Sequence, residues 1–575
     1  MFLLGDERKK IPFLIFLFLA SSMLDLAGIG LIGPYVALVV NPDSLDNGPF
    51  FKLFKFVGLP LEQQPLLIWI GCIIVLIFFL KAVFSIFIHS KIAVFSNNQQ
   101  VRLKSFLMQA YQNMPYKDYL KRNSAEYIQA IQIYTRSYGA VLDTGLKTVS
   151  NGLVGIAILA LLAWNNGLAL GLLIFLLWAM VYGYDKLFRK NISKYGQLAN
   201  EATTKMVQGV HEGIEGLKEI RILGKENHFY QMVHTGAKES ARYSIRSQII
   251  SVAPRYLIEF IMVFFVVTIV FFSLLMGNDL NSLAVTLGMF GFGALRLMPS
   301  ANVISNSLIS LRFNRHSIST ITADLHELKI SNQEMEPQLS PLEIAEKLRC
   351  FTFRNVTFSY PNSNFSALNN ISLEINASES IGLVGTSGSG KTTLVDVLLG
   401  LLEPQEGELC YNGKPLIESL AKWRHQVAYL PQQVFLIDDT LRRNVAIGVD
   451  DENIDDLQLN EAIRQARLIE LVEQLPDGKN TFLGERGIRL SGGQRQRVAL
   501  ARAFYHKRNV LIMDEATSSL DNETEEQILE EIKYLKGKKT MIVIAHRQST
   551  VQHCDRIYRL EHGWITEVGS PEEVL

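Results

Sequence analysis

The sequence predicts a multidomain protein: an all-α transmembrane domain of six helices, followed by an α/β P-loop nucleotide-binding domain. Three observations support this. The chain has 575 residues, too many for a single core. Hydrophobic residues make up 48% of it and charged residues only 19%, and the long apolar runs lie in its first half. A glycine-rich phosphate-binding motif follows at 385–393. We expect a membrane domain at 1–316, a linker at 317–347 and a nucleotide-binding domain at 348–575.

Apolar runs, each close to the roughly 20 residues that span a bilayer, occur at about 11–40, 66–95, 140–164, 168–188, 255–276 and 282–311. A secretory signal peptide is the rival interpretation of the first run. Its apolar core would be shorter, and a small-residue cleavage site would follow. The segments after the second and fourth runs are rich in Lys and Arg, whereas the short ones after the third and fifth contain none. The positive-inside rule therefore predicts cytoplasmic termini and a cytoplasmic nucleotide-binding domain.

The two inner segments keep helical periodicity, for example over 199–221, so we expect the spans to continue as helices beyond the membrane. Breaks at 114–119 and 222–229 mark candidate helices that contact the nucleotide-binding domain, the alternative being solvated hairpin tips. The outer segment 50–57 contains four phenylalanines and two lysines. We interpret it as an interfacial helix that either anchors itself or meets a lipid-like substrate.

Ionisable groups at bilayer depth are costly and usually face a cavity or a partner. Three such cations are Lys81, Arg255 and Arg296. Structural alternatives exist for two of them, since Lys81 could pair with Asp25 or Asp143, and Arg255 could snorkel or pair with Glu259. Taken together, the three suggest a cavity that receives a negatively charged group.

The positive and negative charges of the chain balance. Lys plus Arg and Asp plus Glu each number 56, which gives no argument for nucleic acid as a partner. The four cysteines lack metal-ligand spacing, and we interpret them as structural thiols in or beside a reducing compartment.

The phosphate-binding motif follows an apolar strand pattern and precedes a helical one, which is the Walker A context. Its glycines allow backbone N–H groups to surround phosphate oxygens, its lysine reaches the outer phosphates, and its first threonine can hold Mg²⁺. The predicted ATP-binding residues here are Gly385, Thr386, Ser387, Gly388, Ser389, Gly390, Lys391, Thr392 and Thr393.

Further candidate residues follow the motif along the chain. The amide of Gln432, after a short strand, can reach Mg²⁺. Residues 491–494, with Ser491, Gly493 and Gln494, have the pattern of a helix N-terminus and a second phosphate-binding surface. The rival interpretation of 491–494 is a simple capping turn. Tyr360, at the end of a predicted strand, is placed where its ring could stack on adenine. The rival interpretation of Tyr360 is an ordinary tyrosine at a strand end.

The apolar strand 510–514 ends in two acids. Asp514 is expected to bind Mg²⁺, and Glu515 to polarise the attacking water. His546 follows another buried strand and can contact the γ-phosphate, the rival interpretation being a surface histidine.

Together, Walker A, the LSGGQ segment, the strand ending in Glu515, and His546 resemble the signature set of ATP-binding cassettes. One cassette behind six spans resembles a half-transporter of the ABC exporter class over essentially the whole chain. The resemblance implies ATP and Mg²⁺ as cofactors, and a homodimer with two competent sites, each between Lys391 of one copy and Ser491 of the other. It also implies that the Asp521 segment carries signals between sites and that Glu485 meets the transmembrane helices.

The segment 294–302, the turn at 253–255 and the outer aromatic helix resemble the PglK-type flippase of bacterial protein N-glycosylation. That family carries a polyprenyl-pyrophosphate-linked oligosaccharide across the bacterial inner membrane. The resemblance places the pyrophosphate near Lys81, Arg255 and Arg296. The family has arginine at the first position, so Lys81 keeps the charge without the bidentate fork.

Two alternatives remain open. An exporter of another amphipathic lipid, a drug or a peptide would use the same ATP-binding cassette. A non-transporting ABC protein that acts on translation or DNA is disfavoured by the six spans.

Overall fold

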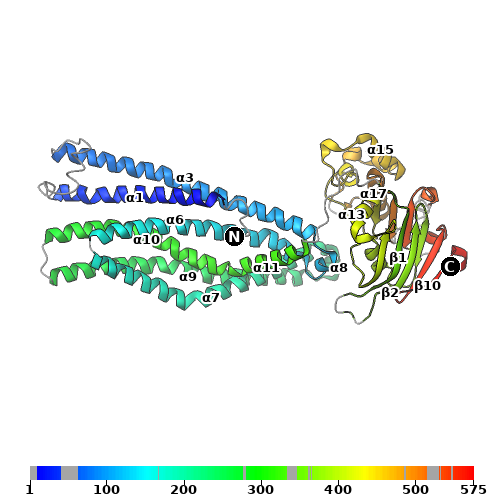
Figure 1. Cartoon of the computed structure of the whole chain (residues 1–575), viewed down its shortest axis with the longest axis horizontal. Helices are drawn as coiled ribbons and strands as arrows, with labels where there is room; N and C mark the ends of the chain where they lie inside the picture. The colour runs from blue at the N-terminus through cyan, green and yellow to red at the C-terminus, as the bar shows by residue number, and fades with distance from the viewer. Residues whose placement is uncertain are drawn as a thin grey trace. The chain divides into compact units, whose positions relative to one another are not determined.

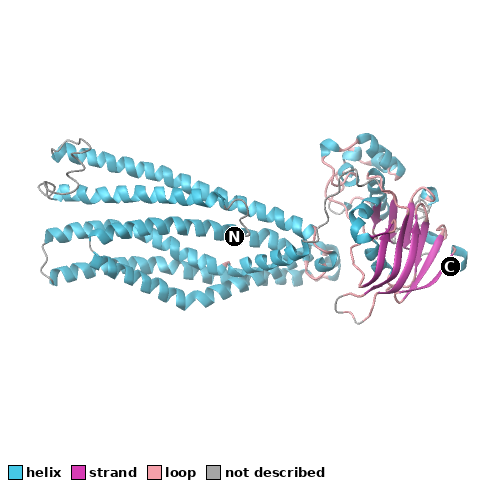
Figure 2. Cartoon of the chain, in the orientation of Figure 1, coloured by secondary structure: helices cyan, strands magenta, loops and turns pink. Residues whose placement is uncertain are grey.

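The computed structural model describes residues 9–40, 63–165, 167–275, 280–332, 346–360, 363, 365–484, 487–514, 530, 533–544 and 548–575. The chain divides into two compact units, Met1–Met114 with Tyr119–Gln333 and Pro115–Asp118 with Glu334–Leu575. The described part of the first unit consists of helices, and the second is built on two β-sheets (Figures 1 and 2). The predicted fold class, a helical membrane domain before an α/β domain, is confirmed.

The main helices of the first unit are α1 (Ile11–Val40), α3 (Gln63–Gln112), α6 (Thr135–Asn165), α7 (Gly167–Glu215), α9 (Glu226–Leu275) and α10 (Leu280–Phe313). Among the described residues, five stretches are long and apolar enough to cross a membrane: Ile11–Gly28, Gln64–Gln112, Ser124–Ala163, Leu170–Glu215 and Glu226–Phe272. The sixth expected span falls within α10, where many side chains lie outside the described part, so it stays a prediction.

The helices extend well past the predicted spans. α3 and α9 have 50 residues each and α7 has 49, more than twice the roughly 20 that a bilayer requires. The two expected breaks are also present. Pro115 precedes the four-residue helix α4 (Tyr116–Tyr119), and Gly224, with a φ of +62°, ends α8 (Leu217–Leu223) in the left-handed conformation that glycine tolerates. The prediction of long helices with these interruptions is confirmed.

α7 makes close contacts with both α9 and α10. α7 and α9 lie side by side along much of their length (Figure 1). A Cβ atom at Gly196 of α7 would lie 2.0 Å from the carbonyl oxygen of Phe313, at the end of α10. Any side chain at Gly196 would therefore force these two helices apart.

The second unit contains a four-stranded sheet of order β2-β1-β4-β5 and a six-stranded sheet of order β10-β9-β3-β8-β7-β6. The first comprises β1 (Cys350–Phe358), β2 (Leu368–Asn376), β4 (Glu406–Tyr411) and β5 (Lys414–Pro415). The second comprises β3 (Ser380–Val384), β6 (Val427–Leu430), β7 (Val510–Asp514), β8 (Thr540–Ile544), β9 (Arg556–Glu561) and β10 (Trp564–Gly569). The strands β9, β3, β8, β7 and β6 run parallel. Both sheets contribute to one core, in which Phe351, Ile542 and Trp423 are fully buried.

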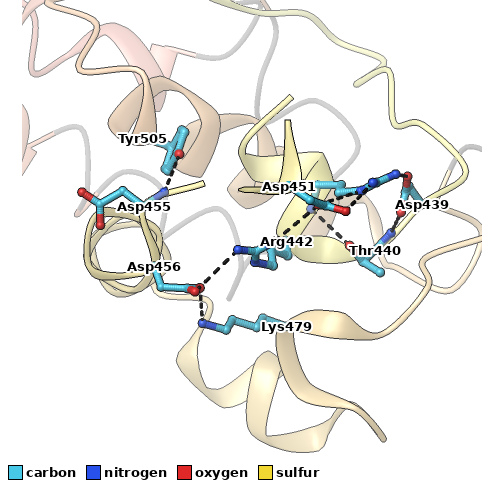
Figure 3. Close-up of polar contacts among 9 residues, drawn as sticks. Asp439, Thr440, Arg442, Asp451, Asp455, Asp456, Lys479 and Tyr505 are labelled. Carbon is cyan, nitrogen blue, oxygen red and sulfur yellow. Dashed lines mark hydrogen bonds and ion pairs between the residues drawn. The ribbon is translucent and has the colours of Figure 1, made fainter. Parts of the chain in front are cut away.

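A second core surrounds α17 (Gly492–Tyr505), which packs on α14 (Leu441–Val445) and α15 (Asp456–Gln465). Ion pairs join α14 and α15 to the segments beside them (Figure 3). Lys479 contacts Asp456 at 2.6 Å, and the Nε of Arg443 donates to Asp451 at 2.9 Å. The backbone N–H of Asp455, just before α15, donates to the Tyr505 hydroxyl at 3.2 Å. These contacts fix the segments around α17.

Candidate nucleotide site

The glycine-rich loop joins β3 to α12 (Lys391–Leu398), as the strand, loop and helix pattern predicts. Gly388 and Gly390 have φ angles of +78° and +106°, which residues with side chains rarely adopt. A Cβ atom at Gly390 would also lie 2.6 Å from the carbonyl oxygen of Ala367. The loop therefore requires glycine, and its backbone N–H groups at the start of α12 form a surface of the kind that binds phosphate.

Two side chains of the loop fit an anionic ligand. Lys391, only 6% exposed, donates from Nζ to the carbonyl oxygens of Gly385 at 2.8 Å and Thr386 at 2.9 Å. The Oγ of Ser389 is buried, and no hydrogen-bond partner for it occurs among the described residues. An ammonium held across the loop and an unpartnered hydroxyl both supply donors, so the residues present fit the phosphates of ATP.

Strand register brings the predicted Mg²⁺ residues to the same edge of the sheet. Leu383 of β3 pairs with Ile544 of β8, and Ile544 pairs with Asp514 of β7. Asp514 is therefore level with the strand end that leads into the phosphate loop. Gln432 is exposed in the loop after β6, the strand on the other side of β7, and Thr392 is exposed on α12. Carboxylate, hydroxyl and amide oxygens at one sheet edge suit Mg²⁺.

Two residues at this edge were not predicted from the sequence. The hydroxyl of Tyr429, in β6, donates to Oδ2 of Asp514 at 3.0 Å. Asp396 lies one helical turn after Thr392 in α12, and burial together with the charge of Asp514 raises its pKa to about 6. The four-residue spacing from Thr392 is a signal that could have indicated Asp396, because such residues share a helix face.

The LSGGQ segment forms the N-terminus of α17, as predicted. Ser491 is the N-cap: its Oγ accepts from the backbone N–H of Gln494 at 3.2 Å, and its own N–H donates to Oε1 of Gln494 at 2.9 Å. This capping box is the rival interpretation given above, and it is present. It leaves Ser491 exposed at a helix N-terminus, so a role toward phosphate stays a proposal.

Tyr360 lies just after β1, and its ring packs edge-on against Phe358 with centroids 5.1 Å apart. Its hydroxyl lies 3.2 Å from Oγ1 of Thr393, on α12. Tyr360 is 36% exposed as a whole residue, so it stands beside the phosphate loop with part of its surface available. Glu485, Glu515, Asp521 and His546 lie outside the described residues, and their roles stay predictions.

The three membrane cations have different surroundings. Lys81 forms a buried ion pair with Asp25, which is one of the two partners considered for it; Asp143 instead contacts Lys147. The Nε of Arg255 lies 3.2 Å from Oε1 of Glu259, and the Arg255 side chain is 64% exposed. The side chain of Arg296, in α10, lies outside the described part. Carboxylates thus accompany the two described cations, and their binding of an anionic substrate stays a proposal.

Comparisons with known proteins match both parts of the chain. Residues 368–518 match the family model described as ABC transporter, and residues 11–292 match the ABC transporter transmembrane region. An ATP-dependent lipid A-core flippase of Cupriavidus metallidurans is 31% identical over 484 residues, which is 84% of this chain and 80% of that protein. One of Chromobacterium violaceum is 29% identical over 97% of this chain and 92% of its own.

A solved structure of a bacterial Atm1-family ABC exporter with ATP bound has a similar fold. The TM-score is 0.78 at 22% identity, and the alignment covers 99% of this chain and 96% of that one.

Proposed function

The chain belongs to the ABC transporter family, and from this premise we propose that it is a flippase that uses ATP to move a phosphorylated glycolipid across the bacterial inner membrane. It is an ATPase coupled to transmembrane transport. In the specific form of the proposal, two copies form the transporter and the substrate is a polyprenyl-pyrophosphate-linked oligosaccharide.

The observation that carries the lipid assignment is similarity over both units. Relatives that align with nearly the whole chain are lipid flippases by name. A tail that remains in the bilayer leaves only the charged head and the sugars in need of a polar route. Lys81, Arg255 and Arg296 are proposed to meet the phosphate groups, each in a segment that the sequence places in the membrane.

The nucleotide residues are proposed to act in three roles. The phosphate loop and Tyr360 hold ATP, and Thr392, Gln432 and Asp514 hold Mg²⁺, which would neutralise phosphate charge when bound. Glu515 accepts the proton of the attacking water, and His546 steadies the γ-phosphate. Ser491, Gly493, Gln494 and Asp521 of the second copy complete each site.

Reconstitution tests the proposal directly. The purified chain in proteoliposomes should remove a fluorescent polyprenyl-pyrophosphate glycan from one leaflet only when ATP is present. Glu515→Gln should retain ATP binding and lose both hydrolysis and flipping. If Glu515→Gln hydrolyses ATP at an undiminished rate, the assignment of the base is wrong.

A second substrate, the lipid A-core glycolipid, is favoured by the names of the relatives. The same assay with that lipid separates the two candidates, because an excess of the unlabelled true substrate should inhibit the flipping of its labelled form. Arg255→Ala and Arg296→Ala should abolish flipping and leave basal ATPase intact; loss of both activities would indicate a folding role instead.

A further inference from the structure

α7 and α9 carry exposed cations close to the ends of their predicted membrane spans. Lys190 and Lys194 of α7 follow the span that is predicted to end at residue 188. Arg242 and Arg246 of α9 precede the span that is predicted to begin at residue 255. All four residues are exposed, and we call them the basic band.

No described carboxylate neutralises the basic band. The sequence contains no Asp or Glu between 186 and 200 in α7, or between 240 and 258 in α9. Asp185 forms an ion pair with Arg312 of α10. Glu239 lies about one turn before the first arginine of the band, on the side away from the predicted span. None of the four cations forms an ion pair with a residue that the structure describes, so their charges remain available to an anion.

The contacts between α7 and α9 bring the four cations to one level. The hydroxyl of Tyr184 donates to the carbonyl oxygen of Ile250 at 2.6 Å, and the rings of Tyr195 and Tyr243 stack with centroids 6.1 Å apart. Both lysines lie between these contacts on α7, and the arginines lie between them or one residue past them on α9. At 1.5 Å per residue, the second lysine is about 9 Å past residue 188, within reach of lipid headgroups.

The four side chains also point to one side of the helix pair. Gly196 of α7 faces the end of α10, and Ile258 of α9 packs in an apolar cluster with α10. At about 100° per residue, the two lysines lie roughly 120° and 160° around α7 from Gly196. The two arginines lie at about the same angles around α9 from Ile258. The basic band is therefore on the side of the pair that faces away from α10.

An aromatic ring, rather than a carboxylate, holds one cation of the band. The guanidinium of Arg246 lies over the ring of Tyr195, 5.8 Å from its centroid. Such a contact orients an arginine and leaves its N–H donors free for an anion. Within the predicted span, the exposed rings of Trp178 and Tyr182 stack 5.2 Å apart. Trp and Tyr gather at membrane interfaces, so aromatic rings followed by unneutralised cations indicate a surface at the headgroup level.

We propose that the basic band binds the phosphate groups of anionic phospholipids in the surrounding bilayer. Lys and Arg close to a membrane surface attract anionic lipids, and their N–H donors suit phosphate oxygens. The inference goes beyond the proposed function, because it assigns a partner from the bilayer itself. Arg255, which we propose meets the transported lipid, lies about 180° around α9 from Arg246, so the two surfaces are separate.

The test measures binding of fluorescent phosphatidylglycerol to the purified full chain in detergent, without ATP. Lys194→Gln combined with Arg246→Gln removes two charges, and Lys194→Arg combined with Arg246→Lys keeps them. Lys205→Gln combined with Lys238→Gln is the matched control, because these exposed cations lie on the same helices, 11 and 8 residues further from the predicted spans. Unlabelled phosphatidylglycerol, phosphatidylcholine, sodium phosphate and a polyprenyl pyrophosphate serve as competitors. The thermal unfolding midpoint verifies folding.

We expect the double glutamine variant to bind phosphatidylglycerol about 25-fold more weakly, at roughly fivefold for each cation. The charge-retaining variant and the matched control should bind as the unmodified chain does. Added salt should weaken binding by the unmodified chain more than binding by the glutamine variant.

Unchanged binding by the glutamine variant, or an equal loss in the matched control, would overturn the inference. Displacement by phosphatidylcholine or sodium phosphate as readily as by phosphatidylglycerol would also overturn it. Displacement by polyprenyl pyrophosphate at lower concentrations than by phosphatidylglycerol would assign the band to the transported lipid instead. Because the assay involves neither ATP hydrolysis nor flipping, the inference and the proposed function can fail independently.

Discussion

A single hydroxyl orients the carboxylate that we propose binds Mg²⁺. The hydroxyl of Tyr429 donates to Oδ2 of Asp514 at 3.0 Å. Burial, reinforced by the charge of Asp514, raises the pKa of Tyr429 above its usual value. The phenol therefore stays protonated and remains a donor at any physiological pH.

Tyr429→Phe should weaken Mg²⁺ binding without abolishing hydrolysis, because Asp514 loses its orientation and keeps its charge. Loss of one hydrogen bond implies a rise of roughly fivefold in the Mg²⁺ concentration for half-maximal ATPase. Titration of ATPase with Mg²⁺ measures this, and Tyr534→Phe, at an exposed tyrosine of the same unit, is the control. An unchanged Mg²⁺ titration contradicts the positioning role.

Asp396 gives the site a pH dependence. Its pKa rises from 3.8 to about 6, so between these values the folded chain binds more protons than the unfolded one, and its stability falls as pH increases. Asp396→Asn should therefore stabilise the Mg²⁺-free chain at pH 7.5, by roughly 1 kcal/mol after solvent screening, and have little effect near pH 4. Thermal unfolding in chelator at both pH values checks this, with Asp438→Asn at an exposed position as control. Equal stabilisation at both values would show that the charge is not responsible.

The sequence predicted the phosphate loop because glycine spacing and the following lysine are local signals. Tyr429 could not be found in that way, since its significance comes from its contact with Asp514, which lies more than 80 positions further along the chain. For the same reason, the sequence could not decide between Asp25 and Asp143 as the partner of Lys81. Both carboxylates were plausible on the sequence, and only the packing of α1 on α3 decides between them.

At the scale of elements, α1 and α3 are joined by the buried pair of Asp25 and Lys81, whose side chains are 4% and 10% exposed. Breaking such a pair leaves one charge uncompensated and typically costs 3–5 kcal/mol, whereas removing both charges is often tolerated. We expect Lys81→Met or Asp25→Asn alone to lower the unfolding midpoint strongly, and the double variant to recover most of it.

Flipping measured on the same set separates structure from substrate binding. A double variant that is stable and still transports would remove Lys81 from the proposed substrate site. A double variant that is stable but does not transport would keep Lys81 in the proposed substrate site.

Long apolar periodicity made the membrane helices predictable, and Pro115 and Gly224 made their interruptions predictable. Contacts between helices were not predictable. The bond from Oγ of Ser307, in α10, to the carbonyl oxygen of Thr144, in α6, is an example, because nothing in either apolar run indicates its partner.

For the whole molecule, the proposed homodimer predicts complementation. In a mixed dimer of Lys391→Ala and Ser491→Arg chains, one site combines the intact Lys391 of one chain with the intact Ser491 of the other. Neither variant alone should hydrolyse ATP, and a 1:1 mixture assembled together should recover up to about a quarter of the full activity, since half of the dimers would be mixed. Activity no higher than the average of the separate variants would exclude sites shared between copies.

α7 and α9 have 49 and 50 residues. At 1.5 Å per residue, each is a rod about 74 Å long. A rod of that length acts as a lever arm: a tilt of only about 10° moves its far end by roughly 13 Å. Small angular changes at one end of these helices are therefore amplified into displacements of more than about 10 Å at the other end.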